Sequence, residues 1–216
     1  MQITIREPGS AITHFIAMML AVFAAVPLLV KSGINDGSYC FTAMCIFMTS
    51  MILLYGASTT YHTVNLTGRA LRIFKKIDHM MIFVLIAGSY TPVCLIVLGG
   101  EVGYKLLALV WGIALIGMGI KAVWVTCPKW FSSIIYIAMG WVCVLVFGQL
   151  LETLPTGAFL WLLAGGIIYT VGGIIYALKL SVFNAKHKWF GSHEVFHLFV
   201  MAGSFCHFIC MYLYIA

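Results

Sequence analysis

Long apolar runs alternate with short polar breaks along the whole chain. A helix needs roughly 20 mostly apolar residues to cross a bilayer. Runs of that length are predicted seven times, at residues 12–30, 39–61, 77–98, 104–124, 130–150, 158–180 and 192–215. We therefore predict an all-α membrane protein, a bundle of seven transmembrane helices. The spans nearly fill residues 1–216, which predicts a single integral membrane domain.

Composition supports this prediction and excludes an ordinary soluble domain. The chain is 63% hydrophobic and 8% charged, whereas soluble domains are about 25% charged. The first apolar run follows Arg6 but is longer than the core of a signal peptide, so we expect it to be retained. A net charge of +6 would suggest nucleic acid in a soluble protein. Here the basic residues gather at the ends of spans, which favours a role in orientation and no nucleic-acid partner.

The distribution of basic residues predicts how the bundle is oriented. Ten of the twelve lie before span one, or in or next to the breaks on that same side: Arg6, Arg69, Arg72, Lys75, Lys76, Lys121, Lys129, Lys179, Lys186 and Lys188. Lys31 and Lys105 fall on the other side. Because positive loops stay in the cytoplasm, we predict a cytoplasmic N-terminus and an external C-terminus.

Ionisable residues at the start of span seven point to a metal site. His193 and His197 are four residues apart, which places both rings on one helix face about one turn apart. A charge at the centre of a membrane helix costs about 2.5–3.5 kcal/mol on insertion scales, so such residues need a reason to be there. Span two ends with Ser58 and His62 at the same spacing.

The predicted topology brings these residues to a common depth. Span two ends on the cytoplasmic side at His62, span three starts there at Asp78, and span seven starts there at His193. Three imidazoles leave one position open on a tetrahedral zinc ion, as in catalytic zinc sites. We predict His62, His193 and His197 as metal ligands. Asp78 would bind or deprotonate a water at the open position and Ser58 would orient it. The alternative for Asp78 is an interfacial residue paired with Lys75.

The remaining histidines and the cysteines are expected to pack. They are His14, His79, His187, His207 and seven cysteines, of which only Cys127 lies outside the predicted spans. His207 lies about 280° around the helix from His197, so both are not expected to face one ion. No cysteine pair has C-x-x-C spacing, and no disulfide framework is predicted. Pro92 is expected to kink span three, with Ser89 or Thr91 satisfying the freed backbone groups.

Taken as a set, these motifs resemble the haemolysin III family. They are Ser58-x-x-x-His62, Asp78 in Lys-Lys-Ile-Asp-His, the run Ala-Gly-Ser-Tyr-Thr-Pro, and His193-x-x-x-His197 with a later His207-Phe208. The family belongs with the progestin and adipoQ receptors, and the resemblance covers essentially the whole chain. It implies a seven-helix zinc protein of the bacterial plasma membrane.

The resemblance also implies roles for individual residues. The zinc histidines of the family match His62, His193 and His197, and its acidic and hydroxyl positions match Asp78 and Ser58. A distant kinship with alkaline ceramidases implies lipid amide hydrolysis, with a membrane lipid as substrate. Where the bacterial family has an Asn, this chain has Ser10, which leaves the roles of Glu7 and His14 open; either could simply be interfacial.

Several function classes remain compatible with these residues. One is a zinc hydrolase of lipid amides, another a receptor or signalling protein with structural zinc, and a third a membrane-perturbing cytolysin, as the family name suggests. His193-Glu194-x-x-His197 also fits the H-E-x-x-H motif of zinc proteases. That alternative is disfavoured, because it needs a distant acidic third ligand and the only aspartates are Asp36, predicted outside, and Asp78. Glu194 is then expected at headgroup level or supporting a ligand. The sequence does not predict the oligomeric state.

Overall fold

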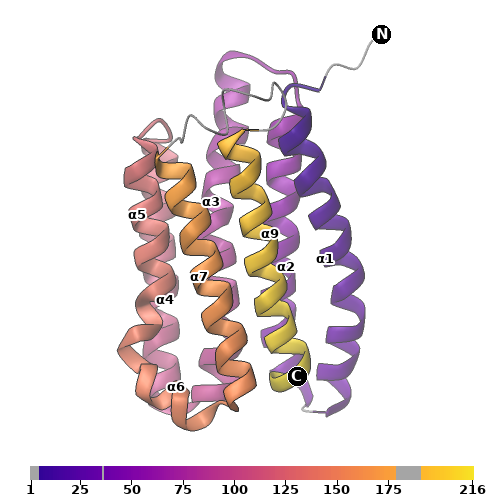
Figure 1. Ribbon diagram of the computed structural model, residues 1–216, viewed down its shortest axis with the longest axis vertical. Coiled ribbons are helices and arrows are strands. Elements are labelled where there is room, and N and C mark those ends of the chain that lie inside the picture. Colours follow the sequence, from indigo (N-terminus) through magenta and orange to yellow (C-terminus); the bar gives the residue numbers. More distant parts are fainter. Residues whose placement is uncertain (1–4, 36, 179–190) are drawn as a thin grey trace.

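Seven long helices run side by side in the computed structural model, which describes residues 5–35, 37–178 and 191–216 (Figure 1). They are α1 (Pro8–Asn35), α2 (Gly37–Thr63), α3 (Gly68–Pro92), α4 (Gly100–Val123), α5 (Lys129–Gly140), α7 (Thr156–Leu178) and α9 (Ser192–Cys210). π-helical turns extend α3 through Val93–Leu98 and α9 through Met211–Ile215, and 3₁₀ turns at Trp141–Val146 join α5 to α6 (Phe147–Thr153).

The described residues confirm the predicted fold class. They contain no strand, and seven of their helical segments are long and apolar enough to cross a membrane. α1 begins at one end of the bundle and α9 finishes at the other, as seven crossings require (Figure 1). The break predicted after span six, with Lys179, Lys186, His187 and Lys188, lies outside the described residues, as does Asp36.

Two predicted boundaries are wrong. Residues 62–76 were expected to form the longest break, but α3 begins at Gly68, and only residues 64–67 separate α2 from α3. Long basic side chains bury their stems and extend their charges towards the headgroups, so a helix can continue through them. The fifth span was predicted to end at residue 150 but continues to Thr153, so that only Leu154 and Pro155 separate it from α7.

The helix changes type directly after Pro92, where a kink was expected. Proline has no N–H to donate to the carbonyl four residues earlier, here that of Gly88. α3 runs through Pro92 and then widens into π-helical turns. The hydroxyls of Ser89 and Thr91 donate to the carbonyls of Ile86 (2.8 Å) and Ala87 (2.9 Å), not to that of Gly88 as expected.

The helices form a ring around an internal space. α1 packs against α2 and α9, α3 packs against α2 and α4, and α7 packs against α5 and α9. α2 is the most enclosed, and its buried side chains include Phe47 and Tyr55. α3 approaches α2 closely at Gly88, where an added Cβ would lie 2.1 Å from the Ser50 hydroxyl. This close contact packs the middle of α3 directly against α2.

Candidate metal centre

Three histidines converge at the end of the bundle where α1, α3 and α9 begin. His62 is in the last turn of α2, and His193 and His197 are in the first two turns of α9. One ligand nitrogen of each lies within 4.8 Å of the others, and the Nε2 atoms of His62 and His193 are 3.3 Å apart. A tetrahedral ion with metal–nitrogen bonds of about 2.0–2.1 Å holds its ligands about 3.3 Å apart. The predicted ligands are therefore spaced so that they could hold one metal ion.

The contacts of the other ring nitrogen, Nδ1, in His62 and His197 support the same arrangement. Nδ1 of His62 makes a short hydrogen bond to the Glu7 carboxylate. Nδ1 of His197 lies 3.3 Å from the Thr13 hydroxyl, which donates its own proton to backbone carbonyls of α1 and so has lone pairs to accept the imidazole N–H. Metal-binding histidines typically have such partners on the nitrogen away from the metal. The Nε2 atoms of His62 and His197 are thereby left for the shared centre.

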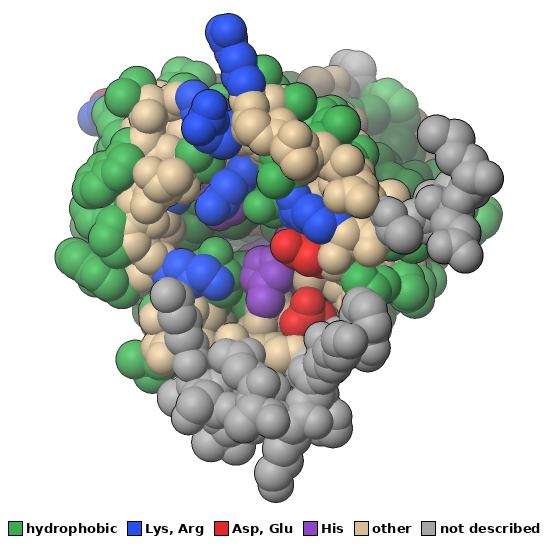
Figure 2. Space-filling model, turned by 90° about the horizontal axis from the view of Figure 1, so that it is seen from above, with side chains coloured by type: hydrophobic (Ala, Val, Ile, Leu, Met, Phe, Trp, Pro, Cys, Tyr) green, Lys and Arg blue, Asp and Glu red, His purple; other side chains and the backbone are tan. Residues whose placement is uncertain are grey.

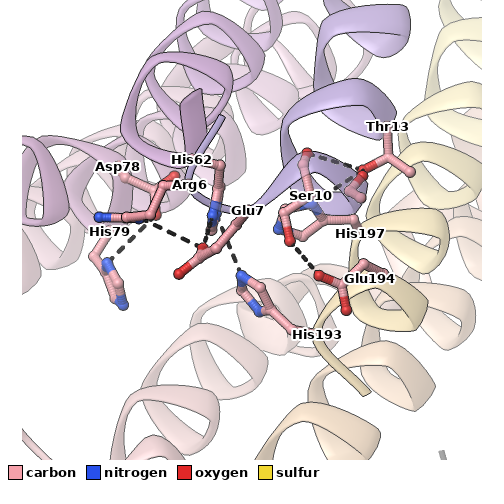
Figure 3. A network of polar contacts seen from close by, with 11 residues as sticks. Arg6, Glu7, Ser10, Thr13, His62, Asp78, His79, His193, Glu194 and His197 are labelled. Atoms are coloured by element: carbon pink, nitrogen blue, oxygen red, sulfur yellow. Dashed lines mark hydrogen bonds and ion pairs between the residues drawn. The ribbon is translucent and has the colours of Figure 1, made fainter. Parts of the chain in front are cut away.

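α1 contributes more to this centre than the sequence predicted (Figure 3). The Glu7 backbone N–H donates to the carbonyl of His62 (3.0 Å), and the His62 side chain binds the Glu7 carboxylate. The hydrogen bond from His62, opposed by burial, lowers the pKa of Glu7 to about 2. His14 is 3% exposed and stacks on His197, with ring centroids 3.6 Å apart.

His14 is therefore a buried residue beside the histidine cluster, and Glu7, whose side chain is 44% exposed, contacts that cluster from the end of the bundle. α1 packs against both α2 and α9, so the inner face of its first turns meets the ligand histidines. Ser10 and His14 are four residues apart, which puts them on one face of α1, and Glu7 is the residue directly before that helix. This spacing could be recognised in the sequence, but it does not show which helices this face of α1 packs against.

Glu194 joins α1 to α9. Its Oε1 accepts a hydrogen bond from the Ser10 hydroxyl (2.6 Å), and its Oε2 accepts one from the Gly191 backbone N–H (2.8 Å). Both oxygens are thus used in fixing the start of α9. This arrangement disfavours the protease alternative, in which that glutamate acts as the general base.

Asp78 and Ser58 lie on the wall of the cavity that the three histidines face. Asp78, 8% exposed, pairs with His79 at 3.5 Å and not with Lys75. Its carboxylate is not part of the cluster of close ligand atoms. Ser58 is buried on α2, one turn before His62. The structure thus brings the five predicted site residues to one cavity, with Asp78 and Ser58 beside the histidine cluster.

The cavity has a volume of about 420 Å³ and a polar mouth. Seen from the end where α1 begins, histidine side chains lie in a hollow, with basic and acidic side chains around it (Figure 2). Deeper in, apolar side chains such as Ile82, Leu85 and Val200 form the wall. His207 lines the deepest part, packed on Gly165, and lies outside the histidine cluster. A charged mouth above an apolar pocket suits an amphiphile.

Fold and site together define a class: helical membrane proteins that cross the bilayer several times and carry a buried cluster of three histidines near one end. Comparison with known proteins narrows this class. The model of the family described as haemolysin-III related matches residues 2–208. The chain belongs to the haemolysin-III related family and is a multi-pass membrane protein.

Individual relatives agree with this assignment. The chain is 35% identical to Hemolysin-3 of Bacillus cereus over 210 residues, which cover 97% of this chain and 92% of the relative. It is 36% identical to the Hemolysin-3 homolog of Bacillus subtilis (strain 168) over 212 residues, covering 98% and 95%. It is also 23% identical to the Adiponectin receptor protein of Drosophila melanogaster over 220 residues, 94% of this chain and 49% of that protein.

Proposed function

We propose that the protein is a zinc-dependent hydrolase of lipid amides. The observation that carries this proposal is the position of the histidine cluster. It lies beside a mainly apolar cavity whose wall holds a carboxylate, Asp78, outside the set of close ligand atoms. A purely structural zinc site would more often have four protein ligands.

The residues present fit zinc. Imidazole is a common zinc ligand, and three of them leave one coordination position open, as in catalytic sites. His62, His193 and His197 would hold the ion. When bound, zinc acts as a Lewis acid that activates water towards a carbonyl carbon.

Side chains of the protein carry out proton transfer, orientation of the water and binding of the substrate. A carboxylate oxygen of Asp78 takes a proton from the attacking water and returns it to the leaving nitrogen. The Ser58 hydroxyl orients the water or the substrate carbonyl. The apolar wall below holds the acyl chain, and burial of the site keeps bulk water away from the reacting groups.

Asp78→Asn tests this division of roles. The amide keeps the shape of the side chain but cannot take the proton, so zinc content should stay at the wild-type level. Turnover of a lipid amide should fall by a factor of about 10² or more, the usual scale for general acid–base catalysis. Each of His62→Ala, His193→Ala and His197→Ala should lose most bound zinc, whereas His79→Ala and His207→Ala should retain it.

The result also separates hydrolysis from the alternatives suggested by the relatives' names, a receptor and a haemolysin. If zinc-loaded wild type and Asp78→Asn show the same negligible turnover of ceramides, acyl-ethanolamides and lysolipids, hydrolysis is wrong and a structural or signalling zinc replaces it. Lysis of red cells by zinc-free and zinc-loaded protein alike would favour the cytolysin.

A further inference from the structure

Two lysines face the mouth of the cavity. Lys75, on α3, lies one turn before His79, and Lys129 is the first residue of α5. The Lys129 ammonium lies 4.2 Å from the centre of the Tyr176 ring, and that ring lies 5.5 Å from the ring of His193. Lys129 is therefore held close to the metal ligands.

Each of the three carboxylates around the mouth has a partner among the described residues. Glu7 binds His62 and Arg6, and Glu194 binds Ser10 and the Gly191 amide. Asp78 pairs with His79. In the part of the chain that the structure describes, no carboxylate forms an ion pair with Lys75. Lys75 is thus available to an incoming anionic ligand, and Lys129 and a bound divalent metal would add to the positive charge of the mouth.

The interior of the cavity has the opposite character. Below the histidines it is lined by apolar side chains, and a smaller cavity of about 90 Å³ shares Tyr90, Trp141 and His207 with its deep end. His207 is ten residues beyond His197, which corresponds to about 15 Å along a helix. An apolar chain can extend over that depth while its polar end stays at the mouth.

We propose that the preferred substrates are N-acyl amino acids, lipid amides whose head group carries a carboxylate. This proposal rests on the proposed amide hydrolysis. The acyl chain occupies the apolar interior, the amide lies at the three histidines, and the carboxylate meets Lys75 and Lys129. In the reaction the amide C–N bond breaks and the oxygen of water enters the fatty carboxylate. Both protons of that water finish on the nitrogen of the released amino acid.

Two ligands that differ only at the head group test the role of the lysines. N-oleoylglycine and N-oleoylethanolamine share the acyl chain and the amide, but only the first carries a carboxylate. Binding of each is measured by calorimetry in zwitterionic lipid nanodiscs. The protein is freed of zinc with a chelator, so that turnover cannot interfere.

We expect wild type to bind N-oleoylglycine about ten times more tightly than the ethanolamide, the scale of a charge-assisted hydrogen bond in a partly screened site. The ratio of the two affinities should fall to about one in the Lys75→Gln, Lys129→Gln double variant. Lys76→Gln is the matched control, because Lys76 is the next residue on α3 and does not line the cavity. It should keep the wild-type preference.

The outcomes distinguish this proposal from amide hydrolysis itself. Equal affinity of wild type for the two ligands, or an equal loss of preference in Lys76→Gln and the double variant, would overturn carboxylate recognition. Equal hydrolysis of both ligands by zinc-loaded protein would also overturn it while leaving the hydrolase intact. A tenfold binding preference with no hydrolysis of either ligand would instead overturn the hydrolase and leave an acidic-lipid binding site.

Discussion

Removing the Glu7 carboxylate should weaken zinc binding, although Glu7 is not a predicted ligand. Its carboxylate accepts the hydrogen bond from Nδ1 of His62, and its backbone N–H holds the carbonyl of the same residue. The first contact fixes the tautomer and the orientation of the ring, so that Nε2 faces the shared centre. Glu7→Ala removes that contact and leaves the backbone contact in place.

The expected magnitude follows from the exposure of the contact. Loss of such a partner typically costs 10- to 100-fold in metal affinity, about 1.4 to 2.8 kcal/mol. The Glu7 side chain is 44% exposed, so water partly screens its charge and can replace it as acceptor. We therefore expect the lower end, about a tenfold increase in the zinc Kd for Glu7→Ala. Glu7→Gln keeps an acceptor oxygen without the charge and should lose less.

Competition with a zinc chelator of known affinity measures this in detergent-solubilised protein. Glu101→Ala is the control, since Glu101 is an exposed carboxylate paired with Lys105 at the opposite end of the bundle. Thermal unfolding of the zinc-free proteins checks that Glu7→Ala still folds. If Glu7→Ala and Glu101→Ala both bind zinc as tightly as wild type, Glu7 does not position His62 and the reasoning fails.

Three further predictions address the packing, a buried thiol and the topology. Gly88→Ala should destabilise the bundle by about 1–3 kcal/mol in thermal unfolding, because its Cβ would overlap the Ser50 side chain. Gly112→Ala is the control and should leave the stability unchanged, because no atom lies within 4 Å of the new Cβ. Equal effects of the two variants would refute this packing argument. Burial raises the pKa of the Cys127 thiol, but hydrogen bonds from Ser132 and Lys121 outweigh it and leave the pKa lowered. Lys121→Met should therefore reduce the thiolate fraction at pH 7 and slow alkylation of Cys127, so an unchanged rate would contradict the pairing. A reporter that is active only in the cytoplasm should be inactive when fused to the C-terminus, and activity there would reverse the predicted orientation.

The fold could be predicted because local composition determines which segments can span a membrane. A run of about 20 apolar residues has few alternatives to a transmembrane helix, since lipid offers no partner for open backbone groups. Helix ends are less determined, because charged residues at the interface are compatible with both helix and loop. For this reason the stretch from Arg69 to Lys76 was predicted as a break and is helical.

The histidine cluster of the candidate metal centre could be predicted in part for a similar reason. The four-residue spacing of His193 and His197 is local, and the depth of His62 and Asp78 follows from counting helices. The contacts of α1 are not local. Glu7 and His62 are 55 residues apart in sequence, and their contact depends on which neighbours α1 packs against. Hydrophobic periodicity does not specify those neighbours, so Glu7 and His14 were left without a role.

The α1 contacts also bear on the departure from the family pattern at Ser10. In this chain Ser10 donates a hydrogen bond to Glu194, which directly follows His193 on α9. The Asn of the resembling family also carries side-chain N–H donors, so either residue can supply a bond of this type. The substitution therefore does not by itself remove the tie between α1 and α9. The arrangement of the cluster depends on three segments: α2 and α9 provide the histidines, and the start of the chain orients two of them through Glu7, directly before α1, and Thr13 of α1.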